Sequence, residues 1–233
     1  MNIILVTTGM RSDLLGQTIN SLVVNAANRD KHTLTIVQDG YGHGVDCFNL
    51  DTDLNECNQL IVNLHPQGAS ASRNIGAASI PKYRRQEHVM FIDDDVYMCS
   101  KWDEYFEHLS NFFRPGSVIM SGHAHPFNHT VLRDTRDFYV TNVLSTLNLY
   151  MSWSLWDDVG FFLEPGGPGG SEDVDYCRRA TEKNYNLAVM KPQRVIHCGL
   201  TSSSGKQIVG YNEMVKQNDA LVEYYGLQGV KYE

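Results

Sequence analysis

The stretch Val89-Met90-Phe91-Ile92-Asp93-Asp94-Asp95 is a short apolar run that ends abruptly in three carboxylates. Apolar runs of this length, without polar alternation, are typical of strands buried on both faces of a sheet. In open α/β sheets, ligands gather at the carboxyl ends of the strands. Three adjacent carboxylates repel one another unless a cation or hydrogen-bond donors neutralise them. The stretch therefore predicts a buried strand whose end faces a ligand, and the alternative is a solvated strand end that starts a turn.

Similar short runs recur along the chain, and helical patterns lie between several of them. The other apolar runs are residues 3–6, 34–37, 60–62, 118–120 and 187–190. Apolar residues recur at helical spacing over residues 15–26, 102–113 and 214–225. Ser100 and Asp103 form a Ser-x-x-Asp pattern that predicts the start of the second helix. Strand–helix alternation in the first half predicts an α/β fold with a mainly parallel sheet covered by helices.

The composition is that of one globular domain. The chain has 233 residues, of which 42% are hydrophobic and 20% charged, so a disordered tail or a disulfide-dense miniature scaffold is excluded. A net charge of −8 argues against broad, non-specific binding to nucleic acid. Five cysteines without a Cys-x-x-Cys pair favour reduced thiols. No apolar run has the length of a signal sequence or membrane span, so we expect a cytoplasmic protein.

A second acidic group follows the glycine-rich stretch 162–171. It reads Ser171-Glu172-Asp173-Val174-Asp175. Ser171 fits a helix N-cap, which places Glu172 and Asp173 in the first helical turn. One interpretation is capping alone, because acidic residues there interact favourably with the helix dipole. The other is catalysis, because the same dipole keeps a carboxylate ionised, as a proton acceptor must be.

Three further features are weak individually. His197 follows a short apolar run, where a histidine is either structural or a ligand. Small residues 68–77 surround Arg73 and lead into a helix, which indicates either close helix–sheet packing or a loop beside phosphate. Asp39-Gly40 ends another apolar run and is either a turn or an acceptor for a base or ribose.

Taken in order, these motifs resemble the GT-A glycosyltransferases, most closely glycosyltransferase family 2. The order is Thr7-Thr8, Asp39-Gly40, Gly-x-Ser-x-Ser-Arg-Asn, the Asp-x-Asp (DxD) triplet, Glu-Asp-Val-Asp and His-x-Gly. The resemblance covers residues 3–204. It implies a three-layer α/β/α sandwich, a nucleotide-diphospho-sugar transferase fold, forming one domain over residues 1–233. Within it, residues 1–100 would bind the nucleotide sugar, 101–205 would carry the acceptor and catalytic half, and 206–233 would form a closing helix.

The resemblance also implies roles for individual residues. Donor-binding roles fall on Thr7, Thr8, Arg11, Asp39, Arg73, Asp93 and Asp94. Asp95 and His197 would hold Mn²⁺ or Mg²⁺, and a mixed carboxylate–imidazole site favours Mn²⁺. Asp173 would be the general base of an inverting displacement, and Glu172 would support acceptor hydroxyls.

The resulting hypothesis is a metal-dependent transferase that moves a sugar from a nucleotide-diphospho-sugar to an acceptor hydroxyl with inversion at the anomeric carbon. A UDP-sugar is the donor that we expect. The alternatives are a retaining GT-A enzyme, a sugar nucleotidyltransferase and a non-catalytic nucleotide-sugar-binding module. We expect a glycan or polysaccharide acceptor, with Trp153 and Trp156 on the acceptor side. Arginines and aromatics at 133–139 also suit a modified base in DNA, although the net charge counts against that acceptor.

Overall fold

A computed structural model describes residues 1–8, 12–40, 58–122, 130–163, 172–191 and 193–198. Its main element is a nine-stranded sheet with the order β3-β2-β1-β4-β9-β6-β10-β8-β7. The strands are β1 (Asn2–Thr7), β2 (Thr33–Asp39), β3 (Gln59–Asn63), β4 (His88–Asp93), β6 (Val118–Ser121), β7 (Val131–Asp134), β8 (Phe138–Thr141), β9 (Asn148–Ser152) and β10 (Asn186–Met190). A separate two-stranded sheet pairs β5 (Val96–Met98) with β11 (Val195–His197).

Each of the six apolar runs singled out in the sequence is a strand, but the sheet is mixed rather than mainly parallel. Four neighbouring pairs are parallel and four are antiparallel in the described sheet. The change of direction comes from β9, which lies between β4 and β6 and runs against both. The β7–β8 hairpin adds an antiparallel edge. All four residues of β7 are exposed, so no buried apolar run in the sequence predicts this strand.

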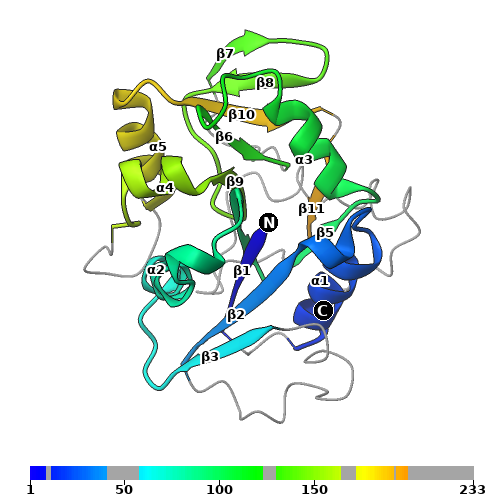
Figure 1. Cartoon of the computed structure of the whole chain (residues 1–233), viewed down its shortest axis with the longest axis vertical. Coiled ribbons are helices and arrows are strands. Elements are labelled where there is room, and N and C mark those ends of the chain that lie inside the picture. Colours follow the sequence, from blue (N-terminus) through cyan, green and yellow to red (C-terminus); the bar gives the residue numbers. More distant parts are fainter. Residues whose placement is uncertain (9–11, 41–57, 123–129, 164–171, 192, 199–233) are drawn as a thin grey trace, which may run out of the picture.

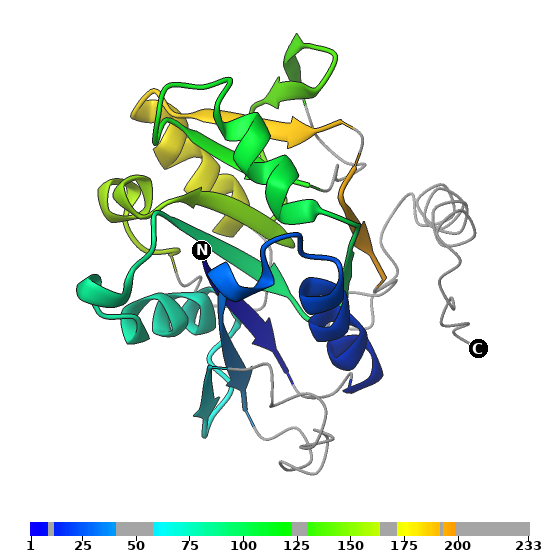
Figure 2. The same cartoon turned by 45° about the vertical axis from the view of Figure 1, so that its right-hand side comes forward.

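Helices cover both faces of the sheet, which makes the predicted three layers (Figure 1). They are α1 (Ser12–Val24), α2 (Ala69–Ser79), α3 (Trp102–Ser110), α4 (Trp153–Val159) and α5 (Glu172–Glu182), with short 3₁₀ turns at Arg29–Lys31 and Lys82–Arg84. Helices α1 and α3 pack with one core cluster, and α2, α4 and α5 pack with the other, on the opposite face. Figure 2, turned by 45°, shows α1 and α3 together on one side of the sheet.

The start of α3 differs from the prediction. Lys101 precedes the helix in the left-handed conformation, with φ 57°, and makes no side-chain cap. The Asp103 carboxylate is buried and instead accepts hydrogen bonds from the backbone N–H groups of Ala27 and Asn28, both at 2.8 Å. The predicted Ser100–Asp103 cap was therefore wrong, because the Asp103 side chain hydrogen-bonds to the backbone of a neighbouring loop. The predicted helix at 214–225 lies outside the described residues.

Close packing of α2 on the sheet explains its small residues. A Cβ on Gly76 would lie 2.5 Å from Ile4 Cγ2 and 3.0 Å from Val37 Cγ2. Only glycine lets the helix approach β1 and β2 this closely. The approach places Arg73, one turn earlier in α2, beside the end of β4. None of the described helices has the length and apolarity needed to cross a bilayer.

Candidate functional site

The acidic triplet lies where β4 ends and β5 begins. Asp93 is the last residue of β4, and its N–H donates to the Leu147 carbonyl at 3.0 Å. Asp94 is buried and accepts a 2.6 Å hydrogen bond from the Thr7 hydroxyl of β1. Asp95, 4% exposed, comes directly before β5. The triplet thus contains one carboxylate held against β1 and two that flank it.

The β5–β11 pairing brings His197 to Asp95. His197 lies opposite Val96 in the ladder, and the next N–H, of Cys198, donates to the Asp95 carbonyl at 2.7 Å. His197 Nε2 then lies 3.2 Å from Asp95 Oδ2. A carboxylate and an imidazole from segments 102 residues apart are thereby in direct contact.

Arg73 joins the acidic triplet to the second acidic group. Its Nη2 donates to Asp93 Oδ1 at 2.6 Å and approaches the Thr146 carbonyl at 3.5 Å. Its Nη1 lies 3.8 Å from Glu172 Oε1, at the start of α5. The guanidinium is 1% exposed and lies 5.6 Å from the centre of the Phe162 ring. One buried cation therefore connects the ends of β4 and α5.

Asp93 and Asp173, one from each acidic group, have raised pKa values. Burial raises the pKa of Asp93; the Arg73 guanidinium opposes this rise, and the neighbouring Asp95 adds to it. Burial also raises the pKa of Asp173, Glu172 adds to the rise, and the N–H of Val174, which donates to Asp173 at 2.8 Å, opposes it. A carboxylate with a raised pKa is a stronger base, which suits Asp173 to accepting a proton.

Asp39 fixes the loop before α2. Its carboxylate accepts hydrogen bonds from the N–H groups of Gln67 at 2.9 Å and Gly68 at 2.7 Å, and from the Asn63 side chain at 3.1 Å. Gly40, with φ +87°, follows; a Cβ there would lie 2.7 Å from the Pro66 ring. Both interpretations from the sequence remain compatible with this arrangement: Asp39 ends a strand at a turn, and it faces the same sheet edge as the triplet.

The residues that the structure describes contain no group of three His, Cys, Asp or Glu side chains placed to hold a metal ion. The donor atoms nevertheless fit a divalent cation that takes its other ligands from a substrate. Asp95 offers carboxylate oxygens and His197 an imidazole nitrogen 3.2 Å away. Oxygen with nitrogen ligands suits Mn²⁺, and oxygen ligands suit Mg²⁺.

Several predicted residues have other surroundings than we expected. Thr7 and Asp94 are buried and bonded to each other, so the structure places them beneath the site rather than on its surface. Trp153 and Trp156 are 5% and 2% exposed. Trp153 donates its indole N–H to Asn2 at 2.9 Å, and Trp156 packs among the Phe91, Phe162 and Tyr176 rings. Their assignment to an acceptor surface was wrong, because both belong to the core.

Thr8 is partly buried after β1, and Arg11, Ser171 and residues 123–129 lie outside the described residues. The sequence analysis missed two supporting side chains. The Thr18 hydroxyl accepts from Val96 N–H at 3.1 Å and lies 2.9 Å from the Asp94 carbonyl. Asn74 exchanges two hydrogen bonds with the Phe162 backbone. The signal for Thr18 was a polar side chain on the apolar stripe of its helix.

Comparison with known proteins supports the fold. No family model matches the chain, and no curated protein matches it in sequence. S. aureus TarS is 16% identical over 83% of this chain and 35% of its own, with a TM-score of 0.60. GalNAc-T7, solved with UDP, GalNAc and Mn²⁺, is 14% identical over 84% of this chain and 42% of its own, with a TM-score of 0.65.

A third structure, TarS 1–349 in complex with UDP-GlcNAc, is 14% identical and is matched over 95% of this chain and 66% of its own, with a TM-score of 0.64. The chain thus spans from about a third to about two thirds of the length of these proteins. At this level of identity the likeness is one of architecture. The chain has the α/β fold of the GT-A glycosyltransferases.

Proposed function

We propose that the protein is a metal-dependent glycosyltransferase that moves a sugar from a nucleotide-diphospho-sugar to an acceptor hydroxyl, with inversion at the anomeric carbon. The observation that carries the proposal is the meeting of both acidic groups at one edge of the sheet, joined by Arg73. Asp93 lies on one side of its guanidinium and Glu172 on the other. His197 completes the edge beside Asp95.

The donor binds along the ends of β1, β2 and β4, with the base and ribose near Thr8 and Asp39. A UDP-sugar is the first donor to test, because GalNAc-T7 was solved with UDP and TarS with UDP-GlcNAc. Asp93 contacts the ribose or diphosphate. Arg73 is buried, so it acts by holding Asp93 in position rather than by extending into the donor pocket.

Asp95 and His197 would hold the Mn²⁺ or Mg²⁺, which would supply positive charge against the diphosphate. The oxygen of the acceptor hydroxyl bonds to the anomeric carbon, and Asp173 accepts the proton that this hydroxyl loses. The bond from that carbon to the β-phosphate oxygen breaks, and the bonding electrons leave with the nucleoside diphosphate. Glu172, held 3.8 Å from Arg73, positions the acceptor hydroxyl.

The acceptor is a glycan or another hydroxyl compound that reaches Asp173. The core position of Trp153 and Trp156 removes them from the acceptor surface. An oligonucleotide bearing a hydroxylated base is the second acceptor class to assay, because Arg133 and Arg136 lie on or beside the exposed β7–β8 hairpin.

The test is a panel of nucleotide sugars assayed by thermal shift and donor hydrolysis, each with Mn²⁺, Mg²⁺ or chelator. Wild type is compared with Asp95→Asn and with Asp134→Asn, an exposed carboxylate that pairs with Lys191 far from the site. We expect one donor to raise the melting temperature only with metal, and Asp95→Asn alone to remove the response. A folded wild-type protein that responds to no donor overturns the proposal.

The anomeric configuration of the product separates inversion from retention. An inverted product, lost in Asp173→Asn with donor binding kept, supports Asp173 as the base. A retained product contradicts that role and leaves the donor site standing.

A further inference from the structure

A pocket lies at the opposite end of the sheet from the carboxylate edge. His88, the first residue of β4, and Ser152, the last of β9, face each other across these antiparallel strands and line it. Asp93 ends the same β4 strand. Because a strand rises about 3.3 Å per residue, roughly 17 Å of strand separates the pocket from the site. The cavity has a volume of about 460 Å³, which is within the usual range for small-molecule sites.

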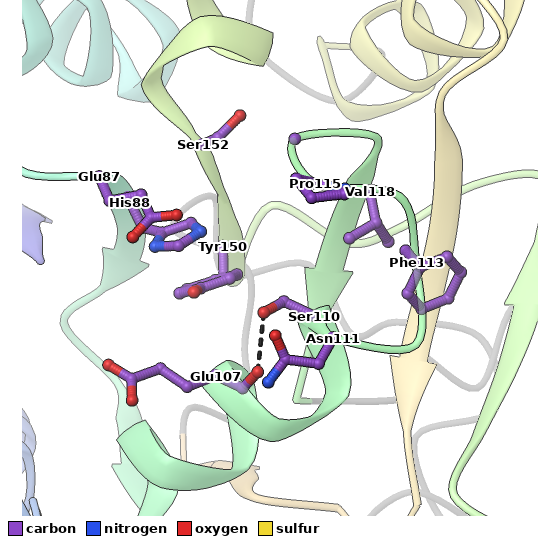
Figure 3. Close-up of a pocket in the computed structure, with 11 residues that line it drawn as sticks. Glu87, His88, Glu107, Ser110, Asn111, Phe113, Pro115, Val118, Tyr150 and Ser152 are labelled. Atoms are coloured by element: carbon purple, nitrogen blue, oxygen red, sulfur yellow. Dashed lines mark hydrogen bonds between the residues drawn. The ribbon is translucent and has the colours of Figure 1, made fainter.

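The pocket has a rigid aromatic floor with a buried hydroxyl. The Tyr150 ring is stacked between His88, at 4.8 Å, and Phe106, at 5.0 Å between ring centres. Tyr150 is 1% exposed, and its hydroxyl makes no well-aligned hydrogen bond to a described residue; burial raises the pKa of Tyr150, and the Ser110 hydroxyl is close enough to oppose this rise. Ser110, the hydroxyl beside it, donates to the Glu107 carbonyl at 2.8 Å (Figure 3). A buried hydroxyl without a well-aligned partner is costly, which points to a ligand that supplies one.

Two carboxylates give the pocket its charge. Glu87 and Glu107 both line it, and neither forms an ion pair with a described residue. Figure 3 shows Glu87 beside His88, with Glu107 reaching from α3 below Tyr150. Burial lowers the pKa of His88, so the imidazole is neutral at pH 7 and does not offset the carboxylates. The nearby Met1 ammonium does not line the pocket and hydrogen-bonds to the Lys31 carbonyl at 2.8 Å and to Gln86.

The far wall is apolar. Phe113 and Val118 lie across the cavity from Glu87 and His88, as Figure 3 shows.

We propose that this pocket binds a small organic cation, an alkylammonium compound, whose nitrogen meets Glu87, Glu107 and the Tyr150 hydroxyl and whose carbon chain packs on Phe113. An ammonium group carries three N–H donors, which matches two carboxylates and one phenolic oxygen. The pocket shares no residue with the donor site, so this proposal stands independently of the sugar-transfer reaction.

The test uses putrescine and cadaverine as probes, with 1,5-pentanediol and glutarate as neutral and anionic controls of similar length. Binding to the full chain is followed by calorimetry and saturation-transfer NMR at low salt. We expect both diamines to bind and both controls to fail. Glu107→Gln is expected to weaken the diamines at least tenfold. Glu104→Gln, on the outer side of the same helix, is expected to leave the affinity unchanged.

Tyr150→Phe provides the second arm, because it removes one oxygen and keeps the stacked ring. Without ligand, the loss of an unsatisfied buried hydroxyl is expected to raise the melting temperature by about 2–4 °C. The same variant is expected to bind cadaverine several-fold more weakly. Equal binding of cadaverine and pentanediol, no binding of either diamine to folded wild type, or a Glu107→Gln variant with unchanged affinity overturns the proposal.

Discussion

The guanidinium of Arg73 connects two carboxylates from different parts of the chain: Nη2 donates to Asp93 Oδ1 at 2.6 Å, and Nη1 lies 3.8 Å from Glu172 Oε1. Because Arg73 is buried, its charge acts on both partners with little screening by solvent. The relative position of β4 and α5 at the site therefore depends on one side chain of α2.

Replacing Arg73 with methionine is expected to lower the free energy of unfolding by roughly 3 kcal/mol, because Asp93 loses its buried partner. Donor hydrolysis is expected to fall at least tenfold. Urea unfolding and the hydrolysis assay measure these effects. Arg178→Met is the matched control: this exposed arginine pairs with Glu182 and Asp175 on the helix surface, and its replacement is expected to leave the free energy of unfolding almost unchanged. Equal losses in both variants contradict a special role for Arg73.

Asp173→Asn is expected to abolish transfer while leaving stability at pH 7 unchanged or slightly higher. The pKa of Asp173 is raised in the folded protein, so ionisation of this group opposes folding. Its favourable contribution to the free energy of unfolding is present below the pKa of the unfolded state and is lost as the pH rises through the pKa of the folded state. For the same reason, the transfer rate is expected to fall, as the pH is lowered, already above pH 3.8, which is the ordinary pKa of an aspartate side chain.

Asp175→Asn is the control on the same helix, and its expected effect on stability has the opposite sign. Burial acts to raise the pKa of Asp175, but hydrogen bonds from Arg179 and Arg178 lower it on balance. Its contribution to stability is therefore present above the unfolded pKa and is lost as pH falls through the folded value. Asp175→Asn is expected to lower stability at pH 7 and keep transfer. Loss of transfer in both variants would show that the helix start, rather than Asp173, is what matters.

Gly76→Ala is expected to destabilise the protein by about 1–3 kcal/mol, although alanine is the better helix former. The added Cβ would lie 2.5 Å from Ile4 Cγ2, so α2 must move away from β1. Donor affinity is expected to fall as well, because Arg73 moves with the helix. Ala78→Ser, at an exposed position of α2, is the control and is expected to change stability by less than about 0.5 kcal/mol. Thermal unfolding and donor titration report both effects.

Asp103→Asn is expected to cost about 2 kcal/mol at pH 7, because the buried carboxylate accepts three hydrogen bonds, one of them from His32 at 3.0 Å. Burial acts to raise the pKa of Asp103, but these hydrogen bonds lower it on balance. The stabilisation is present above the unfolded pKa of about 3.9 and is lost as pH falls below it. The difference between wild type and variant in urea unfolding is therefore expected to shrink from pH 7 to pH 3, and a constant difference contradicts this account.

The parts of the fold that could be predicted were those with a local signal. The apolar run 89–92 and the carboxylates after it identified β4 and the acidic group at its end, because burial on both faces leaves no polar alternation. The exposed β7 carried no such signal. The direction of β9 depends on its pairing with β4 and β6, which a single segment does not encode.

The site shows the same division. The motifs at 93–95 and 172–173 were recognisable individually, but which carboxylate faces inward depends on a partner far along the chain. Asp94 is held by Thr7, and Asp103 by a loop at 27–28. Tryptophans such as Trp156 suggest sugar stacking by their chemistry alone. Only the neighbouring Phe91 and Phe162 rings reveal a core residue.

The contact between Asp95 and His197 has a consequence for the order in which the protein matures. The described strands of the large sheet all lie before residue 191, so a nascent chain of that length already contains all of them. The partner of Asp95 emerges from the ribosome only afterwards, on a three-residue strand whose ladder is formed with β5 alone. A two-stranded ladder is marginal by itself and relies on the surface it docks against. His197 is therefore synthesised after the described strands of the large sheet, and its contact with Asp95 forms only once β11 docks against β5.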